Sequence, residues 1–300
     1  MHALIDEAKR IPSFERIVFS GGECFLLGAD LDMLVAHAHR AGFATRAISN
    51  GYWAIHDRAA RERMRSLRAA GLDEIMLSTG TFHQRFVSPT RIVNAARAAA
   101  SAGISVRVSV EVCDQSTYDA ASLIDDLADL VATGSVCVAQ DPWIADAGGR
   151  GSTTLTHDRV PAEQQASANG RCAQIFTIVT VTPDQILTAC CGFPTEELPS
   201  LRIGSIENRA LDDVLRDAPN ELFKMWLHVS GPAEIAGFVA RYVPGYKLPP
   251  AASICQVCVA LQRDSTAMNV VAEHGGDVVQ EITAAFVRLQ THHSSTAFLR

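Results

Sequence analysis

Apolar and polar positions along residues 1–140 follow two alternating periods. Short runs rich in β-branched and other apolar residues are typical of strands. They cover residues 16–20, 43–49, 72–78, 104–112 and 135–140. Between them, apolar residues recur every three or four positions, and each such segment ends at a glycine. These segments cover residues 31–42, 56–71, 89–103 and 121–134. The alternation predicts parallel strands joined by right-handed helical crossovers, as in an open doubly wound sheet or a (β/α) barrel.

The second half of the chain lacks this alternation. Residues 141–161 are rich in glycine and threonine, which indicates a loop or a boundary. Residues 175–181 and 186–190 flank the turn sequence TPDQ and predict a β-hairpin. A strand end followed by a short helix is predicted for 203–219, and an amphipathic helix for 277–290.

Composition and charge restrict the function classes. Apolar residues make up 48% of the 300 residues and charged residues 20%, which is typical of a folded chain with a substantial core. The formal net charge of −7 argues against non-specific nucleic-acid binding, which needs a basic surface. No apolar run is long enough to span a bilayer, and the start MHALIDEAKR lacks the pattern of a signal peptide. We therefore expect a cytoplasmic protein that binds neither nucleic acid nor a membrane.

Polar residues follow three predicted strands at their carboxyl ends. Gly21, Gly22 and Glu23 follow the first strand, Asn50 follows the second, and Ser78 ends the third. Ligands collect at this edge of parallel sheets. The glycines let a backbone approach a ligand closely, and the carboxylate can accept hydrogen bonds from an ammonium group. Taken alone, the triplet also fits a tight turn with a surface glutamate.

Two further residues are candidates for chemistry in this half. His83 follows the third strand in the segment STGTFHQRF and could act as an acid or base on the substrate side, or as a structural hydrogen bonder. Arg107 lies inside a predicted strand and could pair with a carboxylate in the barrel, including one on a ligand.

The eight cysteines divide into two groups. Cys24, Cys113 and Cys137 are scattered and are expected to be small buried apolar residues. The other five surround the predicted hairpin and a later CxxC pair, a spacing that can hold a metal. They are Cys172, Cys190, Cys191, Cys255 and Cys258. Four of them, with either Cys190 or Cys191, would complete a site. Zinc, an iron–sulfur cluster and a metal-free CxxC all fit this spacing.

The order of these motifs resembles the radical S-adenosylmethionine (radical SAM) enzymes. GGE, ISNG, a strand ending in Ser78 and the helix after FHQRFVSP match the barrel, and C…PDQ…CC…CxxC matches the SPASM or twitch subgroup. The resemblance implies an α/β fold with a partial (β/α) barrel and a small cysteine-rich auxiliary-cluster domain. The implied divisions are a barrel over 1–140, a linker over 141–170, an iron–sulfur domain over 171–262 and a helical tail over 263–300.

The resemblance also implies roles for the candidate residues. Gly21, Gly22 and Glu23 would bind the methionyl ammonium of S-adenosylmethionine, and Asn50 and Ser78 would add polar contacts to this cofactor. The second group of cysteines would hold an auxiliary [4Fe–4S] cluster, with zinc as the alternative. The complete protein would cleave the cofactor reductively and abstract hydrogen from a peptide or small-molecule substrate. It would take electrons from a donor such as a flavodoxin or ferredoxin.

The sequence departs from the family pattern at two points. The CxxxCxxC loop that holds the catalytic cluster is absent, and Cys24 replaces the usual proline after GGE. Because the chain begins within what looks like the first helix, we expect a truncated form that lacks radical chemistry. Two alternatives are a non-catalytic binding protein with a structural zinc or iron–sulfur site held by four cysteines, and a metal-free α/β enzyme that uses Glu23 or His83 as a base.

Overall fold

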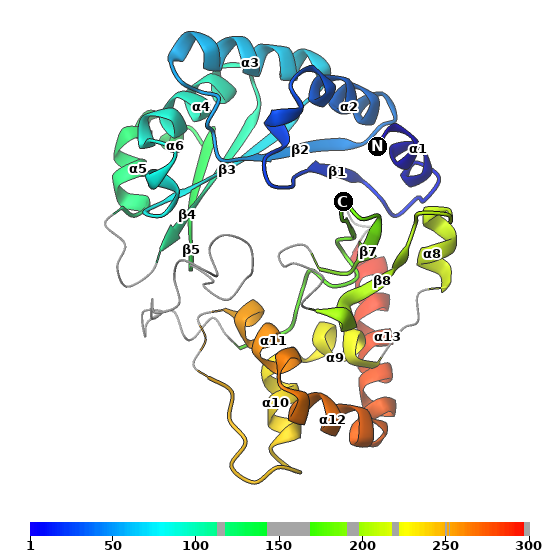
Figure 1. Cartoon of the computed structure of the whole chain (residues 1–300). Coiled ribbons are helices and arrows are strands. Elements are labelled where there is room, and N and C mark those ends of the chain that lie inside the picture. The colour runs from blue at the N-terminus through cyan, green and yellow to red at the C-terminus, as the bar shows by residue number, and fades with distance from the viewer. Residues whose placement is uncertain are drawn as a thin grey trace. The chain divides into compact units, whose positions relative to one another are not determined.

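Figure 1 shows the computed structural model of the chain. Its contacts divide it into two compact units, Met1–Trp143 (unit 1) and Ile144–Arg300 (unit 2), and each is described by itself. The described residues are 1–112, 118–142, 169–190, 198–217, 222–249, 251 and 253–296.

Unit 1 alternates strands and helices as the sequence predicts. Its strands are β1 (Arg16–Phe19), β2 (Ala44–Ser49), β3 (Glu74–Gly80), β4 (Ser105–Val112) and β5 (Val136–Pro142). Its helices are α1 (His2–Ala8), α2 (Ala29–Arg40), α3 (Asp57–Ala70), α4 (Pro89–Ser101), α5 (Ala120–Asp126) and α6 (Ala128–Ala132), with 3-10 turns η1 (Cys24–Leu27) and η2 (His83–Arg85). The predicted α/β fold is confirmed.

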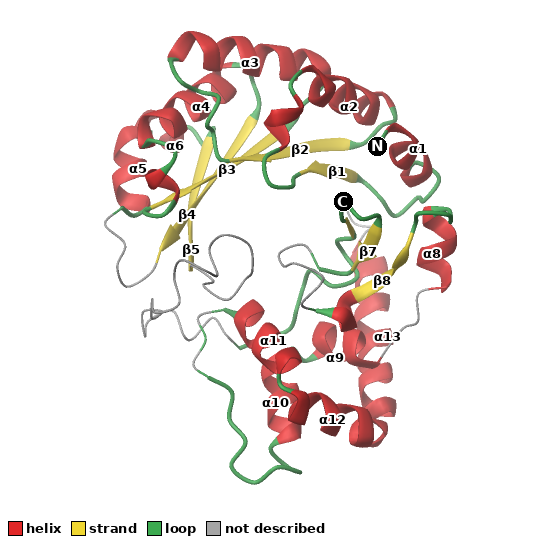
Figure 2. Cartoon of the chain, viewed as in Figure 1, coloured by secondary structure: helices red, strands yellow, loops and turns green. Residues whose placement is uncertain are grey.

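The five strands form one parallel sheet in the order β1-β2-β3-β4-β5 (Figure 2). Each strand therefore pairs with its neighbour in sequence, and the order does not reverse as it does in a doubly wound sheet. Helices α2 to α6 lie along the same side of this sheet (Figure 1). Of the two architectures that the sequence allowed, the arrangement within unit 1 follows the barrel type.

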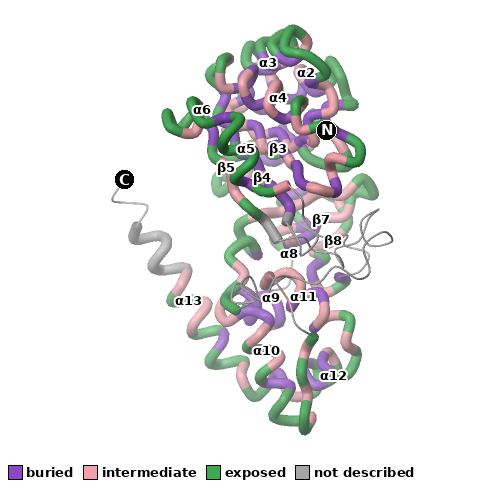
Figure 3. The backbone as a smooth tube through the Cα atoms, turned by 90° about the vertical axis from the view of Figure 1, so that its left-hand side faces the viewer, coloured by how far each residue is buried: buried purple, intermediate pink, exposed green. Residues whose placement is uncertain are grey.

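The two faces of the sheet differ in burial because side chains alternate along each strand. The face beneath the helices is buried and mostly aliphatic, and it includes Ala47, Ile75, Leu77, Val106, Val108 and Val110. Figure 3 colours the backbone by burial and shows buried positions along β3 and β4. Residues on the opposite side, here called the open face, are exposed or half-buried. They include Arg16, Val18, Arg46, Ile48, Glu74, Met76, Ser78, Arg107, Ser109 and Cys137.

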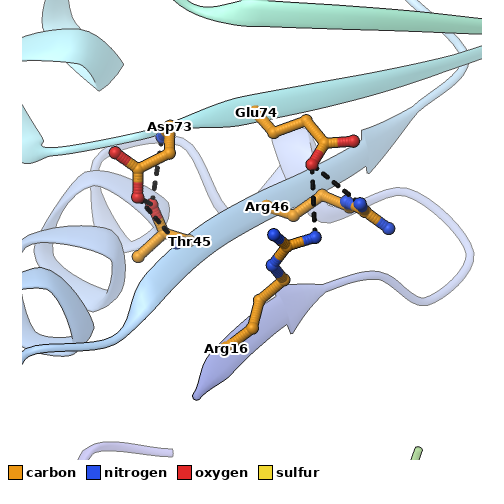
Figure 4. Close-up of polar contacts among 5 residues, drawn as sticks. All are labelled: Arg16, Thr45, Arg46, Asp73 and Glu74. Carbon is orange, nitrogen blue, oxygen red and sulfur yellow. Dashed lines mark hydrogen bonds and ion pairs between the residues drawn. The ribbon is translucent and has the colours of Figure 1, made fainter. Parts of the chain in front are cut away.

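Charged and polar groups join the strands near their amino ends (Figure 4). Glu74 Oε2 accepts hydrogen bonds from the guanidinium groups of Arg46 at 2.7 Å and Arg16 at 3.3 Å. Asp73 Oδ2 accepts hydrogen bonds from the backbone N–H of buried Thr45 at 2.9 Å and from its hydroxyl at 3.3 Å. This network ties β1, β2 and β3 together at one end of the sheet.

Unit 2 combines a small antiparallel sheet with helices. The strands are β6 (Thr180–Val181), β7 (Ile186–Thr188) and β8 (Arg202–Ser205), in the order β6-β7-β8. The helices are α8 (Leu211–Asp217), α9 (Leu222–Val229), α10 (Pro232–Val239), α11 (Ile254–Arg263), α12 (Ser265–His274) and α13 (Val279–Thr296), with 3-10 turns η4 (Pro199–Leu201) and η5 (Gly275–Val278). The predicted hairpin is present, but its first strand covers two residues and not the whole of 175–181.

The core of unit 2 is aromatic and aliphatic. The rings of Trp226 and Phe238 lie 4.8 Å apart, edge to face, and connect α9 with α10. Both side chains are buried, as are Ile235 on α10 and Leu261 on α11. Among the described residues, no helix combines the length and the hydropathy that crossing a bilayer requires.

Candidate functional site

Glu23 joins the loops that follow β1 and β2. Its Oε1 accepts a hydrogen bond from the backbone N–H of Phe25 at 3.0 Å and caps η1. Its Oε2 accepts one from the backbone N–H of Asn50 at 2.8 Å. The preceding Gly21 is exposed and has a φ of +124°, a conformation that favours glycine. The triplet GGE therefore forms a turn whose carboxylate holds two loops in place.

The loop after β2 is further fixed by its own side chains. Ser49 Oγ accepts hydrogen bonds from the backbone N–H of Gly51 at 3.1 Å and from Trp53 Nε1 at 2.9 Å. Asn50 Oδ1 accepts one from the backbone N–H of Tyr52 at 3.0 Å. The ring of Trp53 stacks on Phe25 with 4.7 Å between centroids. This corner of the carboxyl edge is thus tightly packed.

Ser78 lies within its strand and not at the end that the sequence predicts. β3 continues to Gly80, and Ser78 is half-buried on the open face, where it is in register with Ser109 of β4. Glu23 and Asn50 are therefore in contact, and Ser78 lies on another part of the sheet. The cofactor-binding roles of Gly21, Gly22, Glu23, Asn50 and Ser78 stay predictions.

His83 and Glu111 form a close pair at the carboxyl ends of β3 and β4. The imidazole Nδ1 lies 2.6 Å from Glu111 Oε2. Glu111 Oε1 accepts hydrogen bonds from the backbone N–H groups of Phe82 at 2.9 Å and His83 at 3.0 Å. The Glu111 side chain is 9% exposed and the His83 side chain 32%. A buried carboxylate thus orients an imidazole that reaches solvent.

Gly80 makes this pair possible. Its φ is +140°, and a Cβ placed on it would lie 2.1 Å from Glu111 Cδ. Glu111 can therefore lie against the backbone of β3 only because this residue has no side chain. Sequence reasoning identified His83 but missed Glu111. The available signal was the alternation within β4, which places Glu111 on the same face as Arg107.

Arg107 and Cys137 lie side by side on the open face. They are register partners on β4 and β5, and both are exposed. Arg107 lies on the face that the helices do not cover, and its pairing with a carboxylate stays a prediction. The expectation that Cys137 is buried is wrong, because β5 presents it on the face that the helices do not cover. Cys113 lies outside the described residues.

Cys24 is buried, as expected. Its thiol donates a hydrogen bond to the carbonyl of Ile48 at 3.2 Å. Burial, and then the nearby charge of Glu23, raises the pKa of Cys24 to about 12. The thiol is therefore protonated at neutral pH and packs as a small apolar group.

The cysteines of unit 2 converge on one region. Cys255 and Cys258 lie in α11, and Cys172, Cys190 and Cys258 pack against the hydrophobic core. Burial raises the pKa of Cys258 to about 12, and the charges of Cys172, Cys190 and Cys255 add to this rise. Cys191 lies outside the described residues.

The convergence does not amount to a metal centre. Among the described residues, no group of three or more His, Cys, Asp or Glu side chains could hold a metal ion. The prediction of a metal-binding, iron–sulfur protein is therefore wrong for the part of the chain that the structure describes. The assignment of particular cysteines as metal ligands stays a prediction.

No family model matches the chain. Among solved structures, the chain is similar to a protein from Coccidioides immitis named as a member of the dihydrodipicolinate synthase family. The identity is 12%, the TM-score is 0.29, and the match covers 94% of this chain and 89% of that one. A likeness this weak assigns neither an activity nor a ligand.

Membership of the radical SAM family is therefore a wrong prediction. No model of that family matches, and among the described residues no group of side chains could hold the metal cluster that the family pattern implies. The local structure explains the motif that suggested it, since GGE is a turn in which Glu23 caps η1 and holds the next loop. Reductive cleavage of S-adenosylmethionine falls with this membership. The alternative, a non-catalytic protein with a four-cysteine zinc or iron–sulfur site, has no support among the described residues either.

Proposed function

We propose that unit 1 is an acid–base catalyst in which His83 transfers a proton to or from a small-molecule substrate and Glu111 orients it. The single observation that carries this proposal is the 2.6 Å contact between His83 Nδ1 and the buried Glu111 carboxylate. A partly exposed imidazole positioned by a carboxylate is the arrangement that general acid–base catalysis uses.

The pair fixes the chemistry of the imidazole. Because an ionised carboxylate only accepts hydrogen bonds, Nδ1 carries the proton and Nε2 of neutral His83 has a lone pair. Among the described residues, Nε2 has no hydrogen-bond partner, and the ring is 32% exposed. Nε2 can therefore take a proton from a substrate, and Glu111 stabilises the imidazolium that forms.

The location of the pair supports the same function. It lies at the carboxyl edge of a parallel sheet with singly wound order, and we infer that this sheet is part of an incomplete (β/α) barrel. Catalytic groups in such folds come from the ends of different strands. Here the base follows β3 and its orienting carboxylate lies near the end of β4, while a glycine at the end of β3 makes room for the carboxylate.

Two nuclear magnetic resonance measurements test the proposal. The first reads the tautomer of His83 from its ring ¹⁵N shifts, which we expect to show the proton on Nδ1. His37 is the internal control, because its Nε2 lies 2.7 Å from Asp6 and predicts the opposite tautomer. A proton on Nε2 of neutral His83 would contradict the proposed role.

The second measurement follows proton exchange in D2O with a pool of small metabolites. A base that reaches an acidic C–H bond replaces its hydrogen with deuterium, which removes a proton signal. We expect His83→Gln to slow this exchange about 10²- to 10⁴-fold without changing the unfolding midpoint. Equal exchange by the wild type and the variant would exclude His83 as the base.

The other expectations from the sequence are independent of this role. A cytoplasmic location, S-adenosylmethionine, [4Fe–4S] and zinc as cofactors, and an electron donor such as a flavodoxin or ferredoxin stay predictions. A small-molecule substrate is the one partner that the proposed chemistry requires.

A further inference from the structure

Arg107 is an exposed cation on the open face. Arg16 and Arg46 on the same face share the carboxylate of Glu74. Among the described residues, the guanidinium of Arg107 has neither an ion-pair nor a hydrogen-bond partner. In a chain of net charge −7, such a group in the middle of a sheet is available to an anion from outside.

The position of Arg107 relates it to the catalytic pair. Arg107 and Glu111 are four residues apart on β4, about 13 Å at roughly 3.3 Å per residue, and they lie on the same face. Ser109 lies between them, with Ser78 in register on β3. Small hydroxyl side chains thus separate a cation at one end from an imidazole at the other.

We propose that Arg107 binds an oxyanion of the substrate, a carboxylate or a phosphate, while the reacting atom lies at His83. A guanidinium presents a planar set of donors that matches either oxyanion with two parallel hydrogen bonds. The substrate class is then a small anionic metabolite whose charged group and reacting C–H bond are several bonds apart. The evidence for the anion site is the exposed guanidinium of Arg107, and the assignment of the bound anion to the substrate rests on the proposed function.

Cys137 provides a probe that needs no known substrate. Its backbone is one strand spacing from that of Arg107, about 4.8 Å, and its thiol is exposed on the same face. Iodoacetate is an anion and iodoacetamide is neutral, and both alkylate a thiolate. The ratio of their rates at Cys137, measured by mass spectrometry of the peptide that contains it, reports the local preference for an anion. The ratio cancels any change in the fraction of thiolate.

The variant Arg107→Gln should lower the ratio of the iodoacetate rate to the iodoacetamide rate about threefold or more. This is the factor by which one positive charge about 6 Å away in water favours an anion. Arg58→Gln is the matched control, since it removes the same charge from the exposed face of α3, where Arg58 pairs with Glu62. We expect it to leave the ratio unchanged. In the wild type, acetate or inorganic phosphate at constant ionic strength should slow alkylation by iodoacetate at Cys137.

The outcomes separate this site from the catalytic proposal. An unchanged ratio in Arg107→Gln overturns the anion site, and so does a lack of protection by both acetate and phosphate in the wild type. The protection measurement remains decisive if the variant does not fold. Stronger protection by one anion identifies the charged group. Because His83→Gln should leave the ratio unchanged, a positive result here combined with failed proton exchange would retain the anion site and remove the catalytic role.

Discussion

The two ends of the parallel sheet in unit 1 use the same kinds of residue for different purposes. At the amino end, Glu74 receives hydrogen bonds from Arg16 and Arg46, so the charges meet each other (Figure 4). At the carboxyl end, Glu111 accepts hydrogen bonds from two backbone N–H groups and contacts Nδ1 of the His83 imidazole. The other ring nitrogen, Nε2, has no hydrogen-bond partner among the described residues. Because its charged groups pair with one another, the amino end has a structural role. At the carboxyl end, Nε2 of His83 is the atom to which we assign the proposed proton transfer.

This difference follows from the elements that form each end of the sheet. The amino-end network joins three adjacent strands directly, and its groups lie in the register that the sheet imposes. The carboxyl end is built from loops, and loops can aim a side chain outward while the strand beneath supplies the support. The strand β4 therefore holds the Glu111 carboxylate in place, and the loop after β3 carries the partly exposed base His83.

The largest effect is expected for Gly80→Ala at the carboxyl end. The new Cβ would lie 2.1 Å from Glu111 Cδ, and the φ of +140° would strain the backbone. We expect a loss of about 3 kcal/mol in the free energy of unfolding, measured in urea, and loss of the fixed His83 tautomer. Gly103→Ala is the control, because its φ is +74° and no atom lies within 4 Å of the added Cβ. It should cost about 1 kcal/mol. Equal losses in both variants would mean that Glu111 does not need this space.

Glu111→Gln tests whether the carboxylate orients the base. The amide keeps the shape of the side chain but presents one acceptor and one donor group. It can therefore pair with either tautomer of His83 and no longer favours the proton on Nδ1. We expect a mixture of tautomers by ¹⁵N spectroscopy and a loss of proton-transfer activity about as large as that of His83→Gln. Activity that survives with a fixed tautomer would assign the positioning to another group.

Glu74→Gln makes the same chemical change at the amino end. It removes the charge shared by two arginines, and we expect a loss of about 1–2 kcal/mol in the free energy of unfolding. The His83 tautomer and the alkylation ratio at Cys137 should stay as in the wild type. A changed tautomer in this variant would show that the two ends are coupled and would refute the division proposed above.

The smallest effect concerns Cys24 beside the carboxyl edge. Its folded pKa of about 12 is above its ordinary value of 9.0, so the unfolded chain loses the proton first. The stability that this thiol contributes is full below pH 9 and decreases as the pH rises toward 12. From pH 8 to pH 10 we expect a loss of about 1 kcal/mol that is absent in Cys24→Ala, measured by urea unfolding. The same alkaline slope in both proteins would assign it to other groups.

Local pattern predicted the elements of unit 1 but only part of unit 2. The period of two in strands and the closing glycines of helices are properties of short segments, and every predicted strand of unit 1 is present within two residues or so of its predicted ends. Helix α9, LFKMWLHV, was missed because an apolar run of eight residues is too short for periodicity to distinguish a buried helix from a strand, and its residues 223–228 are all buried. Residues at 175–179 read as a strand but lie outside β6.

The sequence by itself determined that strands and helices alternate in the first 140 residues and that polar residues follow the strands, and it named Arg107 and His83 as candidates for chemistry. Only the tertiary structure decided which carboxylate meets His83, because Glu111 is 28 residues further along the chain and approaches it across a strand pair. It also showed that Glu23 holds two loops together through hydrogen bonds to backbone N–H groups. The physical reason is that periodicity depends only on residues that are close in sequence. A hydrogen bond between distant side chains depends instead on strand register and on the space left by a residue such as Gly80.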